Sequence, residues 1–387
     1  MKTVVAPRVL FLGDHFGYPN GVAHGVTVYY LNVLPALVAA GVEVSACFLR
    51  EPHPIAEQLR PAGIDPTFLS AHPANPMVLS RVAQLVRDGG CQIIHATGLK
   101  ASLVGRVVAR MTGAQAIIHV HDLIYPRRGV GALHRAVARK QDFSLCVSRA
   151  AQQVAESGYR VRPDRMRVLH NGIRLDRIRN LPADTGARMR QSLGVPWGVP
   201  VLAMVGRMYP IKGHRAMMQM MPAIAAACPD AHLLLAGDGP ERTVCERMVR
   251  DAGLTNNVHF LGHRHDVPEL LAASDLVLMP SLSEGLGLAA VEAMAAGKPV
   301  VAFDSGGLRD VVLHGNTGRL VPLGDQAAFV RSVLLLLQNG EQRQIYGQRA
   351  IQSADRFSLD RHIDALLDCY MDLAPGAYSL TPHVAHS

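Results

Sequence analysis

Residues 278–297 of the chain run LMPSLSEGLGLAAVEAMAAG. The apolar start of this stretch is typical of a buried strand, and the glycine-rich turn at 284–287 leads into a helical pattern that begins near Leu288. The first backbone N–H groups of a helix have no partner within it, and the helix dipole adds about half a positive charge there. The stretch therefore predicts a strand–turn–helix unit with an anion-binding site at the turn.

Two glutamates flank this turn. Glu284 lies in the loop just ahead of the helix, and Glu292 lies one turn inside it as the only charged residue of an apolar segment. One interpretation of Glu292 is a solvent-exposed helix face. We favour the other, a carboxylate that a bound pair of hydroxyl groups satisfies, because an unpaired carboxylate is costly to bury in so apolar a helix.

The alternation of short apolar runs and helical patterns extends from this unit in both directions. A chain of 387 residues is too long for one hydrophobic core. Strand–helix–strand repeats indicate parallel sheets covered by helices, so we predict an α/β protein of two Rossmann-like, doubly wound domains that face a cleft. They join near 171–185. The expected strands are 8–12, 42–48, 92–95, 116–121, 144–147 and 166–169, followed by 201–205, 232–236, 258–261, 276–279, 299–302 and 318–321.

Composition and cysteine spacing narrow the class of protein. Apolar residues make up 49% of the chain and charged residues only 18%, as expected for buried parallel sheets. The six cysteines include no CxxC pair, so neither a zinc site nor a disulfide scaffold is expected. The start, MKTVVAPRVLFLGD, predicts a first strand instead of a signal peptide, and no apolar run is long enough to span a membrane. We expect a cytoplasmic protein.

The positive charge lies in the first half of the chain. Residues 1–180 contain 22 Lys and Arg against 11 Asp and Glu, whereas the rest contains 17 against 20. No nucleic-acid-binding signature accompanies this charge, and aromatic residues are only 5% of the chain, so we expect no nucleic-acid partner. A basic half suits an anionic small ligand or an anionic membrane surface.

A second motif follows another expected strand. Residues 205–213 run VGRMYPIKG and place two cations, Arg207 and Lys212, in a strand-to-helix loop. In doubly wound sheets such loops lie at the ligand-binding edge, where fixed cations stabilise a departing diphosphate. The alternative is ordinary surface charge. The chain contains no Asp-x-Asp pair to hold a bridging metal, so we expect neither a metal nor another cofactor.

These two motifs, in this order and spacing, resemble the retaining family 4 (group 1) glycosyltransferases of the GT-B fold. The resemblance implies a last helix that crosses back to the first domain. It divides the chain into an acceptor-side domain of 1–172 plus 359–387 and a nucleotide-sugar-binding domain of 173–358. Further matching segments are HNGI at 170–173, AGDGP at 236–240, FLG at 260–262, GG at 306–307, HGNTG at 314–318 and RFS at 356–358.

The resemblance also implies roles for residues of the second domain. Arg207 and Lys212 would bind the donor diphosphate, Glu292 the ribose hydroxyls and Glu284 the hydroxyls of the transferred sugar. The base would rest on backbone at 262–264, and turn amides would line the sugar and phosphates. The expected donor-binding set is Gly25, Gly206, Arg207, Lys212, Gly262, Arg264, Glu284, Gly285, Leu286, Gly287, Leu288 and Glu292, and the expected catalytic set is His121, Glu284, Arg207 and Lys212.

The first domain matches the family less closely. Where the family has a Gly-Gly pair in the first strand-to-helix loop, this chain has His24-Gly25, with Gly21 nearby. The family's acceptor-side histidine corresponds to His121, at the end of the strand in IHVHD. His119, two residues back, is expected to be a hydrogen-bonded core residue.

The predicted reaction moves a hexose from a nucleotide diphosphate sugar to a hydroxyl of a glycan or lipid-linked acceptor, with retention. By the resemblance, the leaving phosphate helps to deprotonate the acceptor, and cell-surface polysaccharide or lipopolysaccharide synthesis is the expected setting. Two alternatives stay open: a nucleotide-sugar epimerase of the same fold, and a non-catalytic nucleotide-sugar-binding protein. The HDLIYP stretch at 121–126 is similar to mannosyltransferase members, which favours GDP-mannose slightly over UDP-sugars.

A basic segment suggests how a lipid-linked acceptor is reached. Residues 127–179 hold 13 Lys and Arg against four Asp and Glu, and 132–141 is expected to be helical. One interpretation is a solvated face. The other is a peripheral patch that docks on anionic lipid at the inner face of the cell membrane, each basic residue contributing about 1 kcal/mol. The residues of this patch are Arg127, Arg128, Arg135, Arg139 and Lys140.

Overall fold

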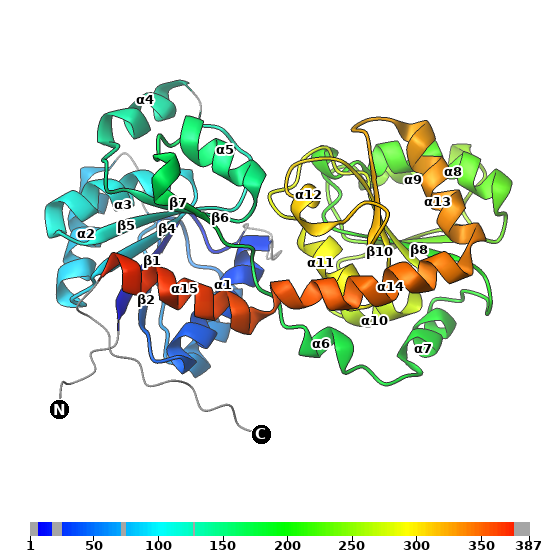
Figure 1. Cartoon of the computed structure of the whole chain (residues 1–387), viewed down its shortest axis with the longest axis horizontal. Coiled ribbons are helices and arrows are strands. Elements are labelled where there is room, and N and C mark those ends of the chain that lie inside the picture. Colours follow the sequence, from blue (N-terminus) through cyan, green and yellow to red (C-terminus); the bar gives the residue numbers. More distant parts are fainter. Residues whose placement is uncertain (1–6, 18–24, 71–74, 127, 375–387) are drawn as a thin grey trace. The chain divides into compact units, whose positions relative to one another are not determined.

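The computed structural model describes residues 7–17, 25–70, 75–126 and 128–374. Contacts divide the chain into two compact units, one within 1–172 and 359–387 and the other spanning 173–358. Each unit is built on one parallel sheet flanked by helices (Figure 1). The predicted α/β class with two Rossmann-like domains is confirmed.

The first unit contains a seven-stranded sheet in the order β3-β2-β1-β4-β5-β6-β7, with every neighbouring pair parallel. The strand order reverses between β1 and β4, which is where doubly wound sheets bind ligands. The strands are β1 (Arg8–Gly13), β2 (Glu43–Phe48), β3 (Thr67–Phe68), β4 (Ile93–Thr97), β5 (Gln115–Val120), β6 (Phe143–Cys146) and β7 (Met166–Val168); the α-helices are α1 (Gly25–Ala39), α2 (Pro76–Asp88), α3 (Leu99–Thr112), α4 (Arg128–Val137), α5 (Arg149–Ser157) and α15 (Leu359–Leu373), with 3-10 turns η1 (Pro54–Ala62) and η2 (Pro163–Arg165).

Alternate side chains of β1 enter two different cores. Val9 and Phe11 pack into the core that includes α1 and α15, whereas Leu10 and Leu12 pack into the core that includes α2 and α3. This is the period of two expected of a strand buried on both faces. Tyr370 of α15 is fully buried in the first of these cores, so the end of the chain returns to the first unit, as predicted.

The second unit contains a six-stranded parallel sheet in the order β10-β9-β8-β11-β12-β13. Its order reverses between β8 and β11. The strands are β8 (Val201–Val205), β9 (His232–Ala236), β10 (Val258–Gly262), β11 (Leu276–Met279), β12 (Val300–Phe303) and β13 (Gly318–Val321); the α-helices are α6 (Asp176–Arg179), α7 (Thr185–Ser192), α8 (His214–Ala227), α9 (Arg242–Asp251), α10 (Val267–Ala273), α11 (Leu288–Ala295), α12 (Leu308–Val311), α13 (Gln326–Gln338) and α14 (Gly340–Ala354), with 3-10 turns η3 (Pro210–Lys212) and η4 (Asp355–Phe357).

One predicted helix is displaced along the chain. The helix expected at 132–141 is α4, which begins at Arg128 and ends at Val137. Residues 138–142 form a turn instead, in which the Asp142 carboxylate accepts a hydrogen bond from the Arg139 N–H at 2.8 Å. The same carboxylate lies 3.0 Å from Arg106, and both side chains are almost fully buried. The sequence pattern missed this ion pair, which holds the turn in place.

Within the described ranges, no helix has the length and apolar character that a membrane crossing requires.

Candidate active site

In the second unit, Lys212 and Glu284 lie at the edge of the sheet where the strand order reverses. Lys212 ends the loop after β8 and Glu284 lies in the loop after β11. The Lys212 Nζ donates to the Glu284 Oε1 at 2.7 Å. The side chain of Glu284 is only 8% exposed, and that of Lys212 is 27% exposed. The lysine therefore offsets much of the cost of burying the carboxylate.

The loops that carry this pair pack backbone against backbone. Gly213 has a φ of 75°, and a Cβ there would lie 1.9 Å from the carbonyl oxygen of Pro280. A Cβ on Gly307, after β12, would lie 2.1 Å from the carbonyl oxygen of Gly285. The Gly307 N–H also donates to the Glu284 carbonyl at 2.8 Å. Only glycine permits these approaches, which hold three loops together around the ion pair.

The turn at 284–287 leads into α11 as predicted. The N-cap, Gly287, has a φ of 94°, and no side chain caps the first N–H groups of the helix. The start of α11 at Leu288 therefore offers uncapped donors where an anion is expected to bind, directly after the turn residues Gly285, Leu286 and Gly287.

Glu292 is partly buried on α11, and burial raises its pKa from the ordinary 4.5 to about 7. In the described part of the chain its carboxylate has no hydrogen-bond or ion-pair partner. This is the environment that we favoured from the sequence, not the solvent-exposed face. A hydroxyl pair from a ligand would supply the missing hydrogen bonds.

The remaining donor-side residues lie on neighbouring loops. Arg207 stacks its guanidinium over the Tyr209 ring at 4.7 Å from the ring centroid. Arg264 makes a two-pronged ion pair with Asp266, at 2.8 and 2.5 Å. The side chain of Arg264 is therefore engaged within its own loop. Gly206 directly follows β8 and Gly262 ends β10, with positive φ values of 149° and 66°.

The first unit has a cavity of about 260 Å³ at the corresponding edge of its sheet. Its walls come from the ends of β1, β4 and β5 and from α1. His121, directly after β5, lines it together with Asp14, Tyr30, Asp122 and Tyr159. Gly25 is the exposed first residue of α1, whereas His24 and Gly21 lie outside the described residues.

The orientation of His121 follows from two neighbours. Its ring packs against the Tyr29 ring at 4.7 Å between centroids. The Asn171 side-chain amide donates to the His121 Nδ1 at 3.3 Å, which places the ring proton on Nε2. Both contacts fix the plane of the His121 ring at the cavity wall.

Behind His121 lies a buried chain of hydrogen bonds. His119 Nδ1 lies 2.9 Å from His95 Nε2, and His95 Nδ1 lies 2.8 Å from the Tyr370 hydroxyl of α15. Burial lowers the pKa of both His95 and His119 well below the ordinary value, so both rings are neutral. His119 is the hydrogen-bonded core residue that the sequence predicted, although it also contributes to the cavity wall.

Sequence reasoning missed Asp14. Its carboxylate accepts hydrogen bonds from the Ala101 and Lys100 N–H groups at 2.5 and 3.2 Å, at the start of α3. A Cβ on Gly98 would lie 2.6 Å from the Asp14 Cγ, so glycine is needed for this approach. Burial is the main reason that the pKa of Asp14 is raised. The signal available in the sequence was a carboxylate directly after the first strand, in Gly13-Asp14.

The two parallel sheets, each covered by helices, define an α/β protein of two doubly wound units. A family model described as glycosyl transferases group 1 matches residues 187–353, and one described as glycosyltransferase family 4 matches residues 23–177. The chain belongs to the group 1 glycosyltransferases.

Similar proteins agree with this assignment. The 2-deoxystreptamine N-acetyl-D-glucosaminyltransferase of Streptomyces fradiae is 35% identical over 258 residues, which are 62% of this chain and 60% of that protein. The 2-deoxystreptamine glucosyltransferase of Streptomyces kanamyceticus is 33% identical over 264 residues, which are 64% of this chain and 67% of that protein. The chain thus spans less than two thirds of the first relative. The crystal structure of Anabaena HepE in complex with UDP has the same fold, with a TM-score of 0.82 at 22% identity, covering 94% of this chain and all (100%) of that one.

Proposed function

We propose that the protein transfers a hexose from a nucleotide diphosphate sugar to a hydroxyl group, with retention of the anomeric configuration. The observation that carries this proposal is the Lys212–Glu284 ion pair beside the uncapped start of α11. It combines a cation for a diphosphate with a nearly buried carboxylate for sugar hydroxyls. Glu292, one turn along the same helix, would take the ribose hydroxyls.

In this proposal the chain works by electrostatic stabilisation and positioning. Lys212 and Arg207 stabilise the charge that develops on the departing diphosphate. Glu284 and the turn amides hold the sugar, and His121 positions the acceptor from the wall of the first-unit cavity without exchanging a proton. Retaining glycosidases need two carboxyl groups about 5–5.5 Å apart. We assign no such pair, so the leaving phosphate takes the proton of the acceptor hydroxyl.

The donor sugar is proposed from the relatives. One is named an N-acetyl-D-glucosaminyltransferase and the other a glucosyltransferase, and HepE was crystallised with UDP. These names favour a UDP-sugar of the gluco series over the GDP-mannose suggested by residues 121–126. A thermal-shift panel tests this choice, because a nucleotide at 100 times its Kd stabilises a protein by about 2.7 kcal/mol. Stabilisation by GDP but not by UDP would favour GDP-mannose as the donor instead.

The acceptor is proposed to present a hydroxyl-bearing ring to the cavity beside His121. Both relatives are named for 2-deoxystreptamine, a small polar acceptor. Asp14 and Asp122 supply carboxylates for hydroxyl or amino groups of such a ring. The terminal sugar of a glycan or of a lipid-linked saccharide would enter in the same way.

Peripheral docking on an anionic membrane is a second proposal, supported by exposed apolar residues beside the basic patch. Ile124, Tyr125 and Leu133 are 64%, 53% and 53% exposed. Arg135 and Lys140 are exposed nearby in sequence and Arg139 is half-buried, whereas Arg127 and the Arg128 side chain lie outside what the structure describes. Cosedimentation with anionic vesicles at low and high salt tests the proposal. A protein that stays in the supernatant at low salt would favour a soluble acceptor.

The decisive assay follows the nucleotide and the sugar separately. With UDP-glucose and 2-deoxystreptamine, a transferase releases UDP and forms a product whose anomeric configuration NMR assigns. An epimerase would convert the donor without an acceptor, and a binding protein would be stabilised by the donor yet release no UDP with any acceptor. An inverted product would overturn the retaining mechanism alone.

A further inference from the structure

The second unit has another cavity, of about 600 Å³, at the edge of the sheet opposite Glu284. Pro200, Asp275 and Lys298 line it, and each stands just before a strand: β8, β11 and β12 respectively. Because these strands are parallel, their amino ends lie at one edge and the loops of the candidate active site at the other. The cavity is therefore separate from the proposed donor site.

The charges around this cavity do not balance. Arg190 pairs with Asp275 at 3.0 Å within the wall. In contrast, the Lys298 Nζ donates only to the Ala272 carbonyl, at 3.1 Å. Arg343, on α14, donates to the carbonyls of the last turn of α13, each at 2.7 Å. Neither Lys298 nor Arg343 forms an ion pair with any residue that the structure describes.

Burial of the Lys298 ammonium group carries a desolvation cost. Burial lowers the pKa of its ammonium group, with Arg190 adding to the effect and Asp275 opposing it. A carbonyl oxygen satisfies one of its donors but does not neutralise the charge. An anion in the cavity would supply both the missing charge and further acceptors.

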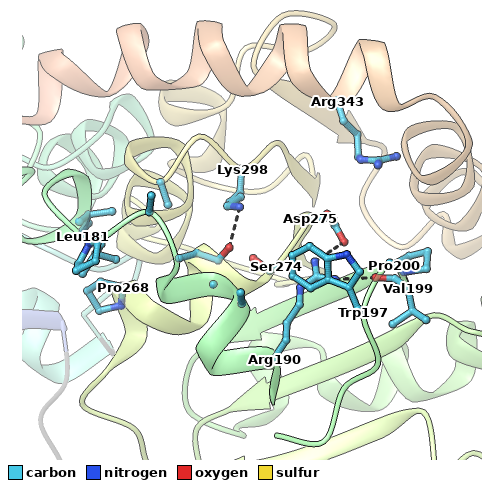
Figure 2. A pocket seen from close by; sticks show the side chains of 18 of the residues that line it. Leu181, Arg190, Trp197, Val199, Pro200, Pro268, Ser274, Asp275, Lys298 and Arg343 are labelled. Atoms are coloured by element: carbon cyan, nitrogen blue, oxygen red, sulfur yellow. Dashed lines mark hydrogen bonds and ion pairs between the residues drawn. The ribbon is translucent and has the colours of Figure 1, made fainter. Parts of the chain in front are cut away.

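Trp197 stands at the rim of the same cavity and is 81% exposed. Tryptophan is enriched at interfaces because its ring offers a large apolar face, so the exposed indole provides a surface on which a planar ring can stack. Its loop is bounded by Gly194 and Gly198, both at positive φ (66° and 82°), and ends at Pro200. Figure 2 shows Trp197, Lys298 and Arg343 as walls of one pocket.

We propose that this cavity binds an organic anion that carries a phosphate group and a planar ring. Lys298 and Arg343 bind the phosphate, and the ring stacks on Trp197. The volume lies in the range of about 300–1,000 Å³ that small-molecule sites occupy. The site is distinct from the donor site in place and in residues, so it is a second ligand site of this chain.

The single tryptophan of the chain makes the test specific, because all indole fluorescence comes from Trp197. The full-length protein is titrated with phenyl phosphate, inorganic phosphate and phenol. We expect saturable quenching by phenyl phosphate. Inorganic phosphate, which lacks the ring, and phenol, which lacks the phosphate, should both bind more weakly. Lys298→Gln and Arg343→Gln should each weaken phenyl phosphate by about tenfold, as loss of a charge-assisted contact does. Glu292→Gln, in the donor site, should leave the titration unchanged.

Matched variants separate loss of binding from loss of folding. Lys298→Gln keeps a polar amide near the Ala272 carbonyl, and urea unfolding of this variant reports on its fold. Arg343→Lys keeps the charge at that position and should bind nearly as wild type. Absence of saturable quenching by phenyl phosphate up to about 10 mM, a concentration that detects even weak ligands, would overturn the proposal. So would equal affinity in wild type and Lys298→Gln, or phenol binding as tightly as phenyl phosphate. A response lost in Glu292→Gln would mean that the signal comes from the donor site.

Discussion

Replacing Lys212 by methionine tests whether the Lys212–Glu284 pair does the chemistry proposed for it. Methionine keeps most of the length of the side chain and removes the charge. It leaves Glu284, whose side chain is 8% exposed, with no cation at 2.7 Å. Truncating one partner of a buried ion pair costs about 3–5 kcal/mol, and the 27% exposure of the Lys212 side chain reduces this to about 2–4 kcal/mol.

The same perturbation should reduce kcat/KM for glycosyl transfer. If the cation stabilises the departing diphosphate, a loss of about 2–4 kcal/mol corresponds to a fall of about 30- to 1,000-fold. UDP release with saturating acceptor measures it, and urea unfolding measures stability in parallel. Arg250→Met serves as the control, because Arg250 is an exposed cation on α9.

A double variant separates the two effects. Glu284→Gln removes the buried charge, so Lys212→Met/Glu284→Gln should be more stable than Lys212→Met, while its kcat/KM stays at least as low as that of Lys212→Met. Turnover of Lys212→Met at the rate of Arg250→Met would refute the proposed role of Lys212. Strictly additive losses of stability would also contradict it, because contacting partners of one buried pair are expected to couple.

Three further results are expected. If Glu292 binds the ribose hydroxyls as a carboxylate, as proposed, its pKa of about 7 means that donor affinity, measured by titration calorimetry, should rise as the pH increases through 7. The folded state holds this proton more tightly than the unfolded state, so the free energy of unfolding should fall as the pH rises from 4.5 to 7. Glu292→Gln should flatten both profiles. Asp142→Ala leaves the fully buried Arg106 unpaired, so it should lower the free energy of unfolding, measured with urea, by about 3–5 kcal/mol. A loss below about 1 kcal/mol, which is typical of a surface ion pair, would contradict a stabilising role for this buried pair. Glycosyl transfer should be unchanged in excess EDTA. If EDTA abolished the activity and Mg²⁺ restored it, a metal would also stabilise the departing diphosphate, in addition to Lys212.

The sequence predicted the sheets because buried parallel strands appear as short apolar runs, which local composition reveals. It missed β3, since two residues carry no periodicity, and it displaced α4, since a distant ion pair through Asp142 ends that helix. Because loops after parallel strands lie at one edge of the sheet, the sequence placed Lys212 and Glu284 at the same edge, but it did not predict their ion pair. The tautomer of His121 depends on Asn171, fifty residues away. The cavity at Trp197 is assembled from the 178–200, 268–275 and 296–298 segments and Arg343, and no local pattern marks it.

Helix α15 affects the order in which the two units can fold during synthesis. Leu366 and Tyr370 complete the core that Val9 and Phe11 begin, so the first unit lacks part of its interior until residue 370 has left the ribosome. The second unit is one continuous segment, 173–358, and all of its strands emerge earlier. Synthesis from the N-terminus usually completes the leading domain first. Here the second unit can fold first, while the first unit still lacks α15 and exposes apolar core residues to chaperones and proteases.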